Sequence, residues 1–107
     1  MEKIKKGPQF GKVYTIDAKS YTKEVKEASQ QSCVVLHLYQ DFLKTCTLLN
    51  KHLNFIADKY PSTKFCKSIS TKTIPKFPDD RLPTFLLFKN GKLIHNVNQV
   101  DKQVKLT

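Results

Sequence analysis

Two neighbouring segments in the middle of the chain have different hydrophobic periods. Residues 33–39 (CVVLHLY) are apolar apart from His37 and rich in β-branched and aromatic side chains, which is typical of a short strand covered on both faces. After them the apolar positions recur at steps of three and four, which predicts a helix with one buried face: Cys46, Leu49, Leu53, Ile56, Ala57 and Tyr60. Pro61 is expected to end this helix. A strand that enters a helix through a short loop begins a βαβ unit, and chemistry gathers at such a loop, here residues 40–46.

One strand and one helix are predicted before this unit. Residues 10–16 (FGKVYTI) are expected to form the first strand. Asp17 is a good N-cap for a helix whose apolar positions follow at helical spacing: Ala18, Tyr21, Val25 and Ala28. The polar run over residues 29–32 is then a turn into the central strand.

After Pro61 the pattern predicts three more strands. Residues 64–69 (KFCKSI) form the third, with Lys67 at an end exposed to solvent, and residues 70–81 are a connection with at most a short helix. Residues 84–88 (TFLLF) form the fourth. The Asn90-Gly91 pair is the strongest hairpin signal in the chain, because these residues adopt the positive φ angles of a two-residue turn. The returning strand over 93–100 is polar, as a weak sheet edge would be.

These elements define one α/β domain. The expected order is β-α-β-α-β, a connection and a β-hairpin, which gives a mixed sheet of about five strands flanked by helices. We assign residues 1–9 to a basic lead and residues 10–107 to the domain. Residues 101–107 are too short for a well-defined helix, so we expect the C-terminal helix to be missing or short. One sheet face would then lack cover, which indicates a part of a larger protein.

The charge of the chain narrows the function classes. Its 107 residues carry a net charge of +10, from 19 basic and 9 acidic residues, and Arg81 is the single arginine. Reading of bases and bidentate binding of phosphate favour arginine over lysine, so no specific nucleic-acid partner is expected. The lysines are spread along the whole chain, which fits a solvated surface or a weak surface for acidic partners.

The cysteines and histidines do not predict a metal or cofactor site. Three cysteines form no disulfide-scaffold spacing, and no signal-like or membrane-spanning run is present, so we expect a cytoplasmic monomer without membrane insertion. His37 is interpreted as a hydrogen-bonded histidine of the core or its rim rather than a metal ligand, and His52 and His95 as surface residues. Three glycines supply little material for a phosphate-binding loop.

Several segments resemble thioredoxins. IDAKSYTKEV is similar to their first-helix entry, LPTFLLFKNGKL to their cis-proline strand and hairpin, and residues 41–46 with LLNKHLNFIADKY to their active-site loop and helix. The resemblance covers nearly all of residues 10–100 and implies a thioredoxin-like fold. It also implies a cis bond before Pro83.

The thioredoxin reaction requires residues that this loop lacks. The family motif is an aromatic residue, a cysteine, two variable residues and a second cysteine, which match in order Phe42, Leu43, Lys44, Thr45 and Cys46. The first cysteine must be an exposed thiolate of low pKa, and a leucine cannot replace it. We therefore expect no disulfide reductase activity. The Cys46 thiol itself is either buried and structural or modifiable.

A second resemblance is more specific. VVLHLYQ, LLNKHLNFIADKYPSTKF and KSISTKTIPKFPDDRLPTFLLF are similar to the carboxy-terminal domain of the phosducin-like proteins, and FGKVYTID to the segment that opens it. The match includes a connecting loop that the fold alone would not dictate. The resemblance implies a redox-inactive module that binds the cytosolic chaperonin and its folding clients, and in some members the βγ subunits of G proteins.

We therefore predict a non-enzymatic, phosducin-like co-chaperone domain. The loop that lacks the first cysteine and the start of the strand after the cis-proline would form its partner groove. The residues are Phe42, Leu43, Lys44, Thr45, Cys46, Pro83 and Thr84. Two other hypotheses are an oxidoreductase that works through Cys46 alone, and a thioredoxin-like scaffold in a ribonucleoprotein. Leu43 argues against the first, and the single arginine argues against the second.

Overall fold

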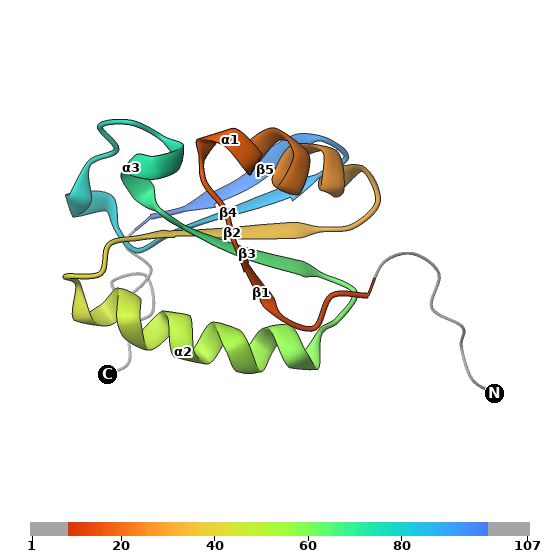
Figure 1. Ribbon diagram of the computed structural model, residues 1–107, viewed down its shortest axis with the longest axis horizontal. Helices are drawn as coiled ribbons and strands as arrows, with labels where there is room; N and C mark the ends of the chain where they lie inside the picture. Colours follow the sequence, from red (N-terminus) through yellow and green to blue (C-terminus); the bar gives the residue numbers. More distant parts are fainter. Residues whose placement is uncertain (1–8, 99–107) are drawn as a thin grey trace.

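A five-stranded sheet forms the centre of the protein. The computed structural model describes residues 9–98 and orders the strands β1-β3-β2-β4-β5, with α1 and α3 on one face and α2 on the other (Figure 1). The strands are β1 (Val13–Thr15), β2 (Val34–Tyr39), β3 (Lys64–Ile69), β4 (Thr84–Lys89) and β5 (Lys92–Val97). The helices are α1 (Ala18–Tyr21), α2 (Lys44–Lys59) and α3 (Ser70–Thr73). Residues 1–8 of the proposed lead over 1–9, the strand end at 99–100 and any C-terminal helix lie outside the described residues.

The sheet is mixed, as predicted. Strands β1, β3 and β2 run parallel, β4 is antiparallel to β2, and β5 is antiparallel to β4. The parallel pairs need crossovers, which the two helical segments around β2 supply, whereas the last pair needs only a tight turn. The order of elements expected from the sequence is therefore confirmed.

The first helical segment is less regular than its spacing predicts. Asp17 caps it in a reciprocal arrangement: Ser20 N–H donates to Asp17 Oδ1 and Asp17 N–H donates to Ser20 Oγ, both at 3.1 Å. The donated bond from Ser20 lowers the pKa of the Asp17 carboxyl. After α1 the chain continues as a π-helical stretch over Thr22–Glu27 and a 3₁₀ turn over Ala28–Gln30.

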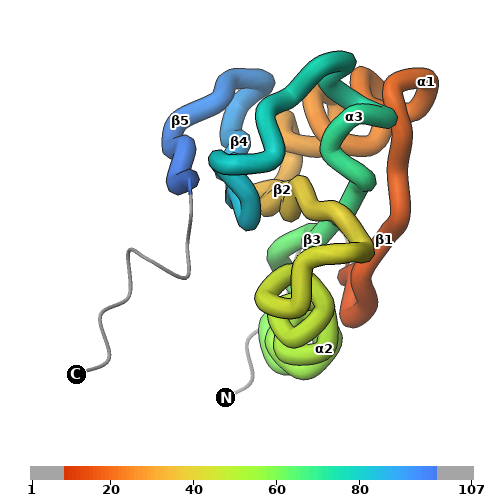
Figure 2. The backbone as a smooth tube through the Cα atoms, turned by 90° about the vertical axis from the view of Figure 1, so that its left-hand side faces the viewer, coloured from red at the N-terminus to blue at the C-terminus, as the bar shows by residue number. Residues whose placement is uncertain are grey.

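Helix α2 buries a narrower face than its apolar stripe predicts. Cys46, Leu53 and Ala57 are buried, but Ile56 is 40% and Tyr60 57% exposed. The prediction of a buried position was wrong for these two residues. Figure 2 shows α2 beneath the β1 and β3 side of the sheet, so only part of the sheet lies over this helix.

The final hairpin is fixed at its turn. Asn90 and Gly91 have φ angles of 55° and 78°, which confirms the predicted two-residue turn. Asn90 N–H donates to the Ser29 carbonyl at 2.7 Å, and Gly91 N–H donates to Ser29 Oγ at 2.8 Å. The turn is therefore attached to the end of the first helical segment.

Two lysines of β3 are less exposed than lysines usually are. Lys64 is buried, donates to Glu24 Oε1 at 2.6 Å and lies 5.1 Å from the ring centre of Tyr14. Lys67, predicted at an exposed end, is half-buried and lies 6.0 Å from the ring centre of Tyr39. Both lysines extend along aromatic surface, which accommodates their aliphatic stems.

The core forms two clusters. The larger one includes Val25, Val34, Leu36, Leu86 and Phe88, and it extends to Cys46 at the start of α2. A smaller cluster lies under α2 and consists of Leu53, Ala57 and Phe65, with Val13, Val35 and Phe85 at its margin. No helix within residues 9–98 lies beneath β4 and β5 on the α2 side (Figure 2).

Candidate functional site at the start of helix α2

The loop between β2 and α2 places Leu43 at the start of the helix, and the resemblance aligns this residue with the thioredoxin nucleophile. Leu43 is the N-cap of α2, with extended φ and ψ angles of −97° and 117° and no side-chain cap. Its N–H donates to the Gln40 carbonyl at 3.2 Å, and its half-buried side chain packs against the larger core cluster. The position is thus occupied by an apolar anchor that fixes the loop to the core.

Cys46, one turn into the helix, is fully buried. It belongs to the same core cluster as Leu43, together with Leu82 and Leu38. A thiol can attack a disulfide only where the disulfide can approach it, so the burial of Cys46 favours the structural role over the modifiable one. Residues 44–46 do form the first turn of a helix, as the resemblance implied.

The start of strand β4, with the proline before it, is also buried. The Leu82–Pro83 bond is cis, as the resemblance implied, and the side chains of Pro83 and Thr84 are buried. Thr84 Oγ1 donates to the Arg81 carbonyl at 2.8 Å. Among the seven predicted site residues, only Phe42, Leu43, Lys44 and Thr45 reach the surface, while Cys46, Pro83 and Thr84 lie in the interior.

His37 lies within β2 and is fully buried. Its Nδ1 donates to Asn50 Oδ1 at 2.9 Å, and its ring stacks on Phe85 with centroids 4.5 Å apart. Burial lowers the pKa of His37 to about 4, so the ring is neutral near pH 7 and Nε2 carries no proton. This confirms a hydrogen-bonded core histidine. The partner Asn50 was missed because it lies outside the apolar stripe of α2.

The remaining candidate chemistry is sparse. No disulfide joins Cys33, Cys46 and Cys66, and burial raises the pKa of the Cys66 thiol to about 11. Within residues 9–98 no group of three metal-ligating side chains comes together. His52 and His95 are exposed, as predicted.

Several apolar residues of this loop and of α2 are exposed. Phe42 is 67% exposed and Phe55 76% exposed, and Leu48 and Ile56 are also at the surface. The sequence carries a signal for Leu48 and Phe55, because both are apolar residues outside the predicted stripe. Exposed aromatic side chains are common anchors of protein interfaces.

Solved structures share this architecture. The short form of thioredoxin f from spinach chloroplast matches with a TM-score of 0.73 at 21% identity, covering 96% of this chain and 92% of the thioredoxin. The long form matches with a TM-score of 0.72 at 21% identity, covering 87% and 81%. The protein is therefore a thioredoxin-fold domain.

The sequence comparisons place this domain in a family. The sequence model of the phosducin family matches residues 1–106. Phosducin-like protein 3 of Mus musculus is 42% identical over 85 residues, which are 79% of this chain and 35% of the mouse protein. Phosducin of Bos taurus is 36% identical over 106 residues, which are 96% of this chain and 43% of the bovine protein. The chain belongs to the phosducin family, as its resemblance indicated.

The chain covers only part of these relatives. It spans less than half the length of the mouse and bovine proteins, and 35% of phosducin-like protein 2 of Drosophila melanogaster, which is 39% identical over 85 residues. Across residues 9–98, no helix has the length and apolar character that crossing a bilayer requires.

Proposed function

We propose that this domain is a non-catalytic protein-binding module that assists or regulates folding by the cytosolic chaperonin. The observation that carries the proposal is the state of Leu43, which replaces a reactive thiol by an apolar side chain packed into the core. Membership of the phosducin family supports a binding role over a catalytic one. The partner class follows from the resemblance to phosducin-like proteins.

The loop at the start of α2 is the proposed contact surface. Phe42 projects the largest apolar group, and Lys44 adds a positive charge beside it. Cys46 and Leu82, the neighbour of Pro83, share the core cluster that holds Leu43, so the interior residues fix the loop from beneath. A preorganised loop loses little conformational entropy when it binds.

Two partner classes follow for this surface. The first is the chaperonin together with its folding clients, in the cytoplasm. The second is the βγ dimer of G proteins, which some phosducin-like proteins bind. The net charge of +10 speeds encounter with acidic surfaces of either partner, but exposed charges are screened beyond about 8 Å at physiological salt. We expect packing around Phe42 to carry most of the affinity.

Affinity capture from a cytosolic lysate tests the proposal, using the chain with its natural flanking sequence. We expect chaperonin subunits to be retained at low salt and mostly retained at elevated salt. The variant Phe42→Ala should lose most of the captured chaperonin. The matched control is Phe55→Ala, which removes an equally exposed phenylalanine from the middle of α2.

Three results would count against this function. If no chaperonin is captured, the proposed role in chaperonin-assisted folding is wrong. Equal losses of captured chaperonin in Phe42→Ala and Phe55→Ala would show that the loop is not the specific contact surface. Capture of nucleic acid with a steep salt dependence would favour the ribonucleoprotein hypothesis instead.

A further inference from the structure

Strand β5 is an edge strand with few features that would block pairing with another chain. It pairs with β4 on one side, and no strand within the described residues pairs with its other side. All six of its residues are exposed, and Lys92 at the turn is the only charged one. Natural edge strands usually carry lysines, prolines or strong bulges that block pairing. Here residues 95–97 pair regularly with β4, and one register shift leaves Ile94 without a partner in the ladder.

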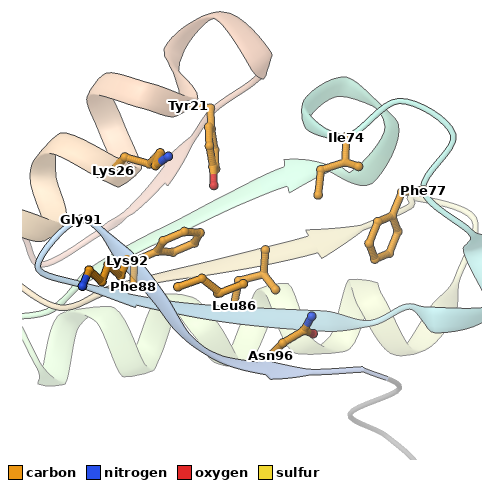
Figure 3. Close-up of a pocket in the computed structure, with 10 residues that line it drawn as sticks. Tyr21, Lys26, Ile74, Phe77, Leu86, Phe88, Gly91, Lys92 and Asn96 are labelled. Atoms are coloured by element: carbon orange, nitrogen blue, oxygen red, sulfur yellow. The ribbon is translucent and has the colours of Figure 1, made fainter.

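An apolar groove opens beside this edge. Its volume is about 430 Å³, and it lies between the first helical segment, the connection after α3 and strands β4 and β5 (Figure 3). Six apolar or aromatic side chains line it: Tyr21, Ile74, Phe77, Leu86, Phe88 and Leu93. Figure 3 shows Tyr21 and Phe77 pointing from above toward Leu86 and Phe88 on β4. Pockets of about 300–1,000 Å³ accommodate large side chains and small ligands.

The polar margin of the groove is positive. Lys26 and Lys92 lie at this margin, and no aspartate or glutamate lines the groove. Neither lysine forms an ion pair in residues 9–98, where the only salt bridge joins Lys64 to Glu24. The groove therefore suits an apolar side chain that has carboxylates next to it.

We propose that β5 and this groove together bind an extended acidic segment of another protein. The segment would add as a further strand beside β5, so that main-chain hydrogen bonds supply affinity. One of its large apolar side chains would enter the groove past Leu93 and Asn96, and its carboxylates would lie near Lys26 and Lys92. None of the residues that line the groove belongs to the loop over residues 42–46, so this surface is separate from the chaperonin contact.

Charge favours this partner over a second copy of the chain. Each copy carries a net charge of +10, and β5 has no carboxylate to place beside Lys26 or Lys92. Pairing of two β5 edges would therefore bring like charges together, whereas an acidic segment neutralises them.

Fluorescence anisotropy with a labelled synthetic peptide tests the proposal on the full chain. The peptide has a central phenylalanine flanked by alternating valine and glutamate, and a second peptide carries lysine in place of glutamate. We expect saturable binding of the acidic peptide and none of the basic one. The double variant Lys26→Glu/Lys92→Glu should weaken the acidic peptide roughly tenfold or more. Lys23→Glu/Lys51→Glu is the matched control, because it changes the net charge equally at two other exposed lysines.

Amide hydrogen exchange then locates the bound peptide. Slower exchange within β5 supports strand addition, and Phe42→Ala should leave binding of the peptide unchanged. Equal weakening by both double variants would overturn the proposal, since the attraction would be general. Lack of saturable binding to the full chain, unchanged exchange in β5, or a concentration-dependent dimer in sedimentation would each overturn it as well.

Discussion

Two parts of the sheet differ in how they are covered. Strand β2 has neighbours on both sides and helices on both faces, and Val34, Leu36 and Leu38 are fully buried. Strand β5 has one neighbour, and each of its six residues is exposed. Strand β2 (VVLHLY) is almost wholly apolar, whereas β5 (KLIHNV) mixes polar and apolar residues, so composition and position in the sheet agree. Strand β4 belongs with the covered part, because Thr84, Leu86 and Phe88 are buried. We infer that the covered part of the sheet maintains the fold and that the edge strand β5 is available for recognition.

Truncation of one buried and one exposed aliphatic residue gives the largest expected contrast. Leu36→Ala should lower the free energy of unfolding by about 2–5 kcal/mol, because it leaves a cavity in the core. Ile94→Ala on β5 should lower it by less than about 1 kcal/mol, because Ile94 is already half exposed. Urea unfolding followed by circular dichroism measures both. Similar losses would contradict the division into a covered part and an edge strand.

The buried histidine makes the covered part sensitive to pH. Its pKa is about 4 in the folded protein, against 6.5 in the unfolded chain, so the unfolded state binds more protons between these values. Stability is complete above about pH 6.5 and falls with acidification, by about 2 kcal/mol at about pH 5. The variant His37→Gln should lose most of this dependence. An unchanged pH profile in the variant would show that another group is responsible.

A smaller effect is expected at the ion pair between β3 and the first helical segment. The Lys64 ammonium lowers the pKa of the Glu24 carboxyl, and Glu24 remains about a third exposed. Glu24→Gln should therefore cost only about 1 kcal/mol of stability, and the loss should shrink at high salt. Glu27→Gln, an exposed residue three positions away, is the control and should cost less. Equal costs would show that the pair does not stabilise the covered part.

The smallest effect is expected in catalysis. Turnover of insulin with dithiothreitol should equal the rate without protein, because Leu43 has no thiol and Cys46 is buried. The change Leu43→Cys restores the spacing of two cysteines around Lys44 and Thr45, and tests whether the geometry of the loop still supports the reaction. Clear turnover by the unchanged chain would refute the binding-module proposal.

The sequence predicts elements best where local signals determine them. Residues 64–69 form β3 with the predicted bounds, and Asn90-Gly91 forms the predicted turn. Ile56 fits the periodicity of the helix but is exposed. The periodicity predicts which residues share a helix face, but not how much of that face the sheet covers. The hydrogen bond between Asn50 and His37 could not be predicted from the sequence, because Asn50 is a polar residue outside the apolar stripe of α2.

The candidate surfaces were predictable to different degrees. The loop over residues 42–46 could be located from the sequence, because strand, loop and helix are consecutive there. The burial of Pro83 and Thr84 depends on packing between distant segments, which the sequence does not show. The groove beside β5 was not predicted, since Tyr21, Phe77 and Leu93 belong to three separate segments that only the fold brings together.

The place of β4 between β2 and β5 has a consequence during synthesis. Strand β2 ends at residue 39, but its second neighbour begins only at residue 84. A nascent chain that has produced β1, β2 and β3 therefore exposes one full edge of its most apolar strand to other chains. The turn at Asn90-Gly91 then attaches to Ser29, 62 residues earlier than Gly91. Until β4 has left the ribosome, this edge of β2 has no partner within the chain, and aggregation would be favoured there.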